Sequence, residues 1–216
     1  MTASAVLQNS VSTIKRPALL IAFSALITAF WLMVSAGPSL SQSAGEAAAM
    51  RQVQALLTSA QQAGSRSSSK SAQVQAIRSV VRRHFAVGTW ANALLGRQKS
   101  KFSGSQQSEF RRLLPGYLAK LYVNQFGGRS VRAGEVTGAS TRRGDVLVTS
   151  RLPRGSGGGN LTVVWRTRVI GGKPRVIDYS VGGVSNVVLK RSEFTSKVRQ
   201  SGPASLNSFL RSFIAA

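Results

Sequence analysis

Four short segments of alternating apolar and polar residues between positions 130 and 185 constrain the fold more than any other feature of this chain. Glycine-rich or basic turn sequences separate them. Consecutive short strands joined by tight turns form an antiparallel meander. The predicted strands are 130–140, 144–152, 160–169 and 173–185, with turns at 141–144, 153–159 and 170–173.

Helical patterns precede and follow these strands, because apolar residues there recur at intervals of three and four. The strongest helix pattern contains Pro115, which predicts a kink, and ends at Gly127-Gly128. The sequence therefore predicts an α+β fold with N-terminal helices, a four-stranded antiparallel meander sheet and two C-terminal helices. The predicted helices are 46–62, 72–98 with a break near Gly88, 105–128, 190–200 and 203–214.

Alternation along the strands gives the predicted sheet two unlike faces. We expect helices to cover the apolar face and solvent to reach the basic face. The apolar face carries Val146, Val148, Leu152, Leu161, Val163, Trp165 and Val169, and the basic face carries Arg151, Arg166, Arg168 and Arg175.

The N-terminus has the pattern of an export signal. Lys15 and Arg16 precede an uncharged apolar run from Ala18 to Val34, and small residues come directly after it. We predict a signal peptide over residues 1–36, a linker over 37–45 and a single domain over 46–216. An uncleaved membrane anchor is the alternative, since the run is slightly long for a signal and slightly short for a spanning helix.

The positive charge of the chain favours polyanionic partners. The sequence has 29 Lys and Arg against 6 Asp and Glu, and no Cys. Such a field attracts nucleic acid or an anionic membrane. An exported protein rarely meets nucleic acid, so we expect a membrane surface or an acidic protein instead. The absence of Cys excludes disulfides and thiolate metal sites.

No constellation of catalytic residues is evident. The six carboxylates are scattered, and His84 is the only histidine, so neither a histidine metal cage nor a Ser/His/Asp triad is expected. The GSGGGN stretch at 155–160 lies between two strands, which favours a turn over a phosphate-binding loop. The sequence therefore argues against an enzyme, and we expect neither a cofactor nor a metal. Binding is left as the function.

Three stretches resemble the MlaC family, also called the toluene-tolerance auxiliary family of periplasmic lipid-binding proteins. FAVGTWANALLGRQ at 85–98 is similar to a family segment ending in Leu-Gly. SGSQQSEFRRLLPGYLAKLY at 103–122 looks like its Gln-x-x-x-Phe helix, and 176–210 resembles its Val-x-Asp-x-x-x-Glu-Gly-Val-Ser signature and the Gly-x-x-x-Leu helix after it. Ala86 and Gly182 stand where the family often has acidic residues.

The resemblance implies a soluble carrier with an apolar lipid cavity between helices and sheet. Such carriers shuttle a phospholipid between an outer-membrane lipoprotein complex and an inner-membrane ABC transporter, maintaining lipid asymmetry. Some relatives are associated with hopanoids. We expect Arg151, Arg166 and Arg168, on the exposed basic face of the predicted sheet, to contact the membrane or a partner. The expected lipid-binding residues are Phe110, Leu114, Tyr117, Leu121, Val148, Val163, Trp165, Val181 and Val184.

Gly182-Gly183 suggests a sharp bend at the end of the last strand, which would place Val184-Ser185 under the closing helices. The alternative is a plain left-handed turn that gates nothing.

Two other functions stay open at this point. One is a basic module that holds an anionic polymer or surface without any cavity. The other is a structural envelope protein that keeps its N-terminal anchor. Steep salt dependence would favour the basic module.

Overall fold

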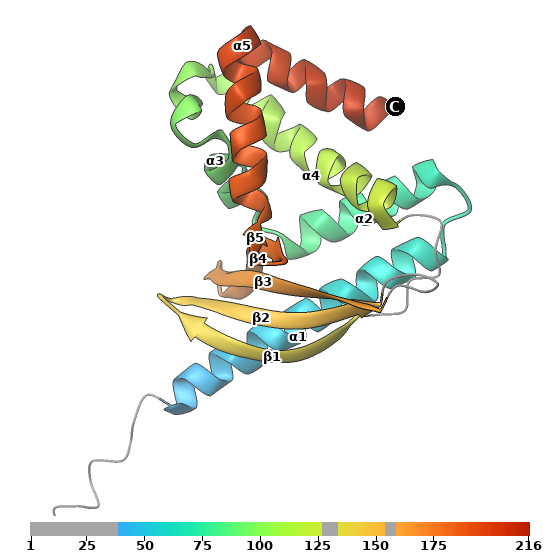
Figure 1. Cartoon of the computed structure of the whole chain (residues 1–216), viewed down its shortest axis with the longest axis vertical. Helices are drawn as coiled ribbons and strands as arrows, with labels where there is room; N and C mark the ends of the chain where they lie inside the picture. The colour runs from blue at the N-terminus through green and yellow to red at the C-terminus, as the bar shows by residue number, and fades with distance from the viewer. Residues whose placement is uncertain (1–38, 127–133, 154–158) are drawn as a thin grey trace, which may run out of the picture. The chain divides into compact units, whose positions relative to one another are not determined.

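The computed structural model describes residues 39–126, 134–153 and 159–216 of the chain, and it has an α+β architecture (Figure 1). Helices and one antiparallel sheet pack around a common apolar core, which confirms the predicted fold class. The α-helices are α1 (Ser39–Ser65), α2 (Lys70–His84), α3 (Val87–Leu95), α4 (Gly104–Phe126) and α5 (Asn186–Ala215), with the 3-10 helix η1 (Gly96–Lys101) after α3. The strands are β1 (Glu135–Arg142), β2 (Asp145–Pro153), β3 (Asn160–Ile170), β4 (Lys173–Val181) and β5 (Val184–Ser185).

The sheet order is β1-β2-β3-β4-β5, and every neighbouring pair is antiparallel. The meander prediction is therefore right, but the number of strands is five and not four. The missing strand is β5, which has two residues, Val184 and Ser185, paired with Val181 and Ser180. A strand this short has no alternating pattern that a sequence could reveal.

The C-terminal element α5 consists of two helical halves on either side of a kink, in the place of the two predicted closing helices. It is bent at Gly202, whose backbone has φ 76° and ψ 174°. Pro203 comes directly after the bend and begins the second half, as a first-turn proline can. In Figure 1 the second half turns back from the first and runs beside α4. The side chain of Ile214 accordingly approaches Gly116 of α4.

The helices before the sheet also differ from their predicted limits. Residues 39–45, which the sequence analysis placed in a linker, lie in α1. The predicted break near Gly88 occurs at Phe85 and Ala86, where α2 ends and α3 begins. Phe85 forms a parallel bridge to Val176, and the Ala86 amide donates to the Val176 carbonyl at 2.9 Å. Contact with β4 therefore ends the helix.

Several sequence-based predictions fall outside the described residues. They are the signal peptide at 1–36, the stop at Gly127-Gly128 and most of the turn at 153–159. Among the described helices, none is long and apolar enough to cross a membrane.

Candidate functional site

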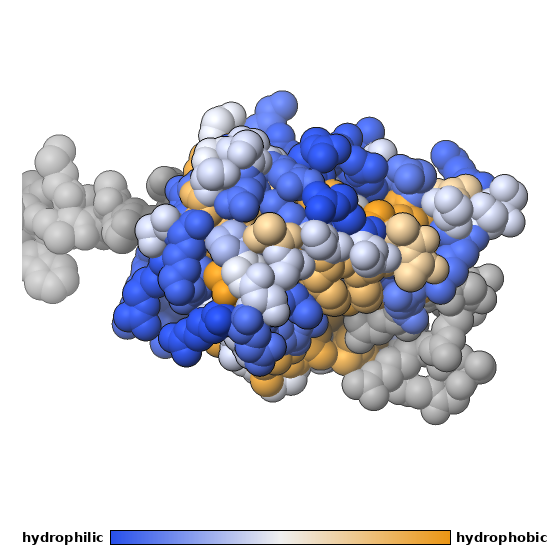
Figure 2. All heavy atoms as spheres, turned by 90° about the horizontal axis from the view of Figure 1, so that it is seen from above, coloured by the Kyte–Doolittle hydropathy of each residue, from blue (hydrophilic) through white to orange (hydrophobic). Residues whose placement is uncertain are grey.

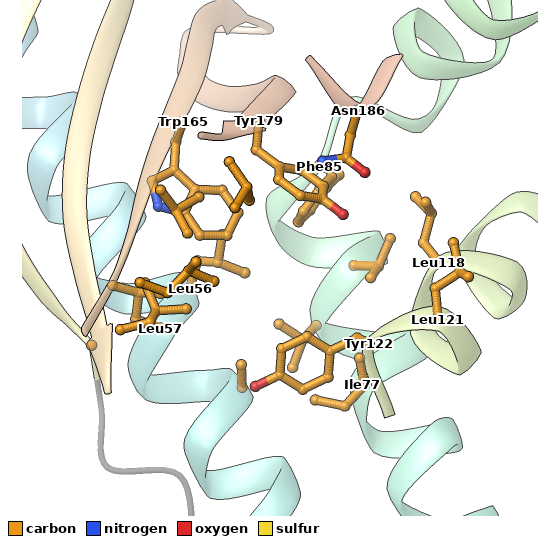
Figure 3. A pocket seen from close by; sticks show the side chains of 18 of the residues that line it. Leu56, Leu57, Ile77, Phe85, Leu118, Leu121, Tyr122, Trp165, Tyr179 and Asn186 are labelled. Carbon is orange, nitrogen blue, oxygen red and sulfur yellow. The ribbon is translucent and has the colours of Figure 1, made fainter. Parts of the chain in front are cut away.

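An apolar cavity of about 400 Å³ lies between the sheet and helices α1, α2 and α4. Figure 3 shows side chains from all of these elements pointing into it. The lining residues are Leu56, Leu57, Ala60, Gln61, Ile77, Val80, Val81, Phe85, Leu118, Leu121, Tyr122, Gly134, Leu152, Leu161, Val163, Trp165, Tyr179, Val181, Val184, Asn186, Leu189 and Lys190.

Three cross-strand pairs build the sheet wall of this cavity. Leu152 pairs with Leu161, Val163 with Val181, and Trp165 with Tyr179. Paired residues lie on the same face of an antiparallel sheet, so all six side chains line the cavity. The Trp165 indole is fixed by a hydrogen bond from its Nε1 to Ser150 Oγ at 2.8 Å.

Side chains outside the cavity hold its helical walls in place. Gln54 of α1 binds the start of the sheet through both ends of its amide: its Nε2 donates to the Gly134 carbonyl, and its Oε1 accepts from the Val136 amide, each at 3.2 Å. Trp90 of α3 is fully buried and donates from its indole to the Val176 carbonyl at 3.1 Å. These bonds fix α1 and the α2–α3 junction against the sheet.

The interior of the cavity carries few polar groups. Burial, and to a smaller degree the nearby Asp178 carboxylate, raises the pKa of Tyr179 to about 12. Burial also raises the pKa of Tyr122. Both phenols are therefore neutral at physiological pH. Among the described lining residues, the ammonium of Lys190 is the only charge, and it is paired with Glu193 at 2.8 Å. Such a lining suits an uncharged apolar guest.

One end of the cavity is open to solvent at residues 184–190, which we call the mouth segment. Val184 and Leu189 line the cavity and are nevertheless 56% and 46% exposed. Asp178 organises this segment: it accepts hydrogen bonds from Ser185 Oγ at 2.5 Å and from the Val187 amide at 3.1 Å. Ser185 in turn caps α5 by accepting from the Val188 amide.

Five of the nine residues expected to bind lipid line this cavity, and four do not. Leu121, Val163, Trp165, Val181 and Val184 lie on its wall. Phe110, Leu114 and Tyr117 are buried on the side of α4 that faces α5, where Phe110 and Tyr117 contact Phe194. Val148 is fully buried between Ala139 and Trp165 in the sheet register.

The sequence patterns indicate no cavity residues on α1 and α2, yet these helices supply a large part of the lining. Their apolar spacing was visible in the sequence, but core and cavity residues share that pattern. On α4, Leu118 and Tyr122 line the cavity beside Leu121. The residues missed on α1, on α2 and directly after α2 are Leu56, Leu57, Ala60, Gln61, Ile77, Val80, Val81 and Phe85.

The predicted basic face of the sheet contains a buried acid. Asp145 is 1% exposed. Its carboxylate accepts a hydrogen bond from the Nε of Arg166 and another from the Nε of Arg168, each at 2.6 Å. Burial alone would raise the pKa of Asp145, but these hydrogen bonds outweigh burial and hold the pKa below its ordinary value. Arg151 is exposed. The charge of two of the three predicted contact residues is thus partly neutralised.

The end of β3 departs from the predicted apolar face. Val169 is 65% exposed and pairs with Pro174, close to the β3–β4 turn. The expectation that it is covered is wrong, because alternation continues past the part of the strand that the helices cover.

Gly182 and Gly183 form the two-residue turn between β4 and β5, with φ 58° and 79°. Two consecutive positive φ values are typical of a type I′ hairpin turn. A Cβ at either position would meet nothing within 4 Å. The backbone thus makes a hairpin here instead of a bend within one strand.

Within the described residues, no three His, Asp or Glu side chains are placed to hold a metal ion. His84 is buried, its Nδ1 lies 3.1 Å from Gln52 Nε2, and burial and Arg83 lower its pKa to about 4. It lies outside the cavity lining.

A model of the family described as MlaC protein matches residues 50–212. The chain belongs to the MlaC family. No curated protein matches it. A solved structure of a phospholipid-binding protein from Ralstonia solanacearum, in complex with a phospholipid, is similar with 17% sequence identity and a TM-score of 0.63. The match covers 77% of this chain and 97% of the Ralstonia chain. The resemblance to the MlaC family is therefore confirmed, and the likeness of the two structures concerns their fold.

Proposed function

We propose that this member of the MlaC family binds lipid in the cavity between its sheet and helices α1, α2 and α4, and that it is a carrier and not an enzyme. The observation that carries the proposal is an apolar space of about 400 Å³ that opens at the mouth segment. The similar fold of a protein whose structure contains a phospholipid supports it.

The energetics of a lipid tail explain why a carrier needs such a space. Moving an acyl chain from a bilayer into water costs about 0.8 kcal/mol for each CH₂ group. For a sixteen-carbon chain this amounts to about 12 kcal/mol on the same scale. An enclosed apolar lining offsets that cost, while the headgroup stays in water beside Lys190 at the mouth.

The volume limits what the cavity holds in this conformation. An apolar cavity of about 150 Å³ accommodates benzene, which corresponds to about 25 Å³ per carbon. On that scale about 400 Å³ holds roughly sixteen carbons. One long acyl chain fits, and a lipid with two such chains would require the helices to move apart or would leave one chain outside.

The wider role is inferred from family membership and the N-terminal sequence. We propose export through a signal peptide over 1–36 and a domain over 46–216 that acts in the periplasm, with α1 beginning at Ser39 inside the stretch predicted as a linker. There it would exchange a phospholipid with an outer-membrane lipoprotein complex and an inner-membrane ABC transporter. Hopanoid is the alternative cargo. Arg151, Arg166 and Arg168 stay a predicted contact for a membrane or partner.

Mass spectrometry of protein purified from the cell envelope without detergent tests lipid binding directly. We expect about one bound lipid per chain, and its mass distinguishes one-chain, two-chain and hopanoid cargo. Ala60→Trp, which places an indole in the cavity, should remove most of the bound lipid. Gln62→Trp is the matched control, because Gln62 lies on the same helix but is exposed and outside the lining. Equal lipid content in both variants would contradict this site.

The net charge of +23 supports one competing function, a basic module that binds anionic surfaces without a cavity. Binding of that kind weakens steeply with salt, whereas burial of an acyl chain does not. If the protein holds no lipid and its association with anionic polymers disappears at high salt, the basic module is the better description.

A further inference from the structure

The mouth segment carries three large apolar side chains that the described fold leaves about half exposed. Val184 is 56% exposed, Val188 is 60% exposed and Leu189 is 46% exposed. Apolar surface between hydrophilic side chains is common in proteins, as on the face shown in Figure 2, and isolated exposed apolar residues need no explanation. Three large ones within six consecutive residues at the opening of a cavity do.

Only two of these three residues serve the cavity. Val184 and Leu189 line it, so their apolar character has a use there. Val188 is the most exposed of the three and lies outside the lining. Its side chain belongs to the outer face of α5, which also carries Arg191 and Arg199 along a shallow groove. The other described residues that line this groove are all polar or basic.

The first half of α5, which begins within the mouth segment, carries a net positive charge. The first half of α5, residues 186–201, contains Lys190, Arg191, Lys197 and Arg199 against one acid, Glu193. Glu193 is paired with Lys190. The Arg191 Nε donates to the Ala93 carbonyl, which holds its guanidinium close to α3. Exposed apolar side chains flanked by cations are the composition that binds anionic bilayers.

We propose that the mouth segment docks on the surface of an anionic phospholipid bilayer, with Val184, Val188 and Leu189 inserted among the lipids and the cations of α5 against the headgroups. This inference rests on the proposed function, because it supplies the place where cargo enters or leaves. A lipid can then pass between membrane and cavity without crossing water.

Two other surfaces compete for this role. At the turn between β3 and β4, Val169 is 65% exposed and Ile170 is 38% exposed. It lies at the opposite end of β4, about nine residues and roughly 30 Å from the mouth. The basic sheet face offers Arg151, but its neighbours Arg166 and Arg168 share Asp145. Neither surface is continuous with the cavity, which favours the mouth segment.

Vesicle flotation of the exported protein, purified from the cell envelope, tests the three surfaces against each other. The probes are vesicles of phosphatidylcholine alone and vesicles with a large fraction of phosphatidylglycerol. Val188→Asp, Val169→Asp and Arg151→Gln each lower the net charge by one, so differences among them report position and not total charge. Lipid extracted from each variant before flotation reports cargo binding separately.

We expect Val188→Asp to weaken binding to phosphatidylglycerol vesicles by about tenfold or more, because an inserted valine is replaced by a charge. The other two variants should lose less than about threefold, and Val188→Phe should bind more tightly. All variants should keep the cargo of the wild-type protein. Equal losses in the three variants, or the largest loss in Val169→Asp or Arg151→Gln, would overturn the proposal. Absence of cargo in the wild-type protein would instead contradict the proposed function, whatever the flotation result.

Discussion

At the scale of single residues, three of the six carboxylates of this chain hold parts of the fold together. Asp178 accepts three hydrogen bonds, from the Tyr179 amide, Ser185 and the Val187 amide, and so joins β4 to the start of α5. Glu109 of α4 binds Asn207 and Arg211 near the end of α5. Asp145 binds Arg166 and Arg168 across the sheet. Each of these acids joins two different elements of the fold, and Glu109 joins two that lie far apart in sequence.

Asp145→Asn should destabilise the protein in a way that depends on pH. The hydrogen bonds from Arg168 and Arg166 hold the pKa of Asp145 below its ordinary value in spite of burial. Such a carboxylate stabilises the fold above its unfolded pKa of about 4, and the contribution is lost as pH falls through the folded pKa. We expect the substitution to lower the free energy of unfolding by about 1–3 kcal/mol at pH 7, since both arginines are half exposed.

Urea unfolding of wild type and Asp145→Asn at pH 7 and at pH 3 measures this effect. The difference between the two proteins should shrink at the lower pH, where the wild-type carboxylate begins to take up its proton. A difference of equal size at both pH values would mean that shape, and not charge, accounts for the loss.

At the scale of elements, sequence patterns predict which segments are helices and strands better than they predict the neighbours of each face. The four longer strands and their antiparallel order can be read from alternation and turn residues. On α4 the apolar stripe is broad, and part of it packs on α5 while Leu118, Leu121 and Tyr122 face the cavity. No local pattern distinguishes these two surroundings, because both bury apolar side chains. Only tertiary packing assigns Phe110 and Tyr117 to the core.

Gly202 controls the path of the last element. Its backbone, with φ 76° and ψ 174°, occupies a region that is essentially restricted to glycine. We expect Gly202→Ala to lower the free energy of unfolding by about 1–3 kcal/mol through backbone strain. Thermal or urea unfolding measures the change.

Gly88→Ala is the matched control for this prediction. Gly88 is exposed within α3, and a Cβ there would meet nothing within 4 Å. The substitution should be neutral or stabilise by up to about 1 kcal/mol. If Gly202→Ala is as well tolerated as Gly88→Ala, the bend in α5 does not depend on glycine.

At the scale of the whole molecule, the cavity leaves the apolar core incomplete. A closely packed interior has few voids larger than a water molecule, whereas here a cavity of about 400 Å³, open at the mouth segment, lies beside Trp165, Tyr179 and the helices. The side chains along it lack contacts on one side, and this loss weakens the packing between helices and sheet. A bound acyl chain would supply the missing contacts. Cargo should therefore act as part of the core, and stability should depend on its presence.

Removal of bound lipid should lower the melting temperature. A ligand that binds only the folded state stabilises it by about 2.7 kcal/mol when present at a hundred times its dissociation constant. For a domain of this size that corresponds to a shift of about 5–10 °C. Scanning calorimetry of protein refolded from urea without lipid, before and after the addition of phospholipid, measures the shift. Ala60→Trp should melt at the same temperature with and without lipid, because the indole takes the place of the chain. A wild-type melting temperature that is unaffected by delipidation would show that the cavity is not a lipid site, since no occupant of the folded state can bind there without stabilising it.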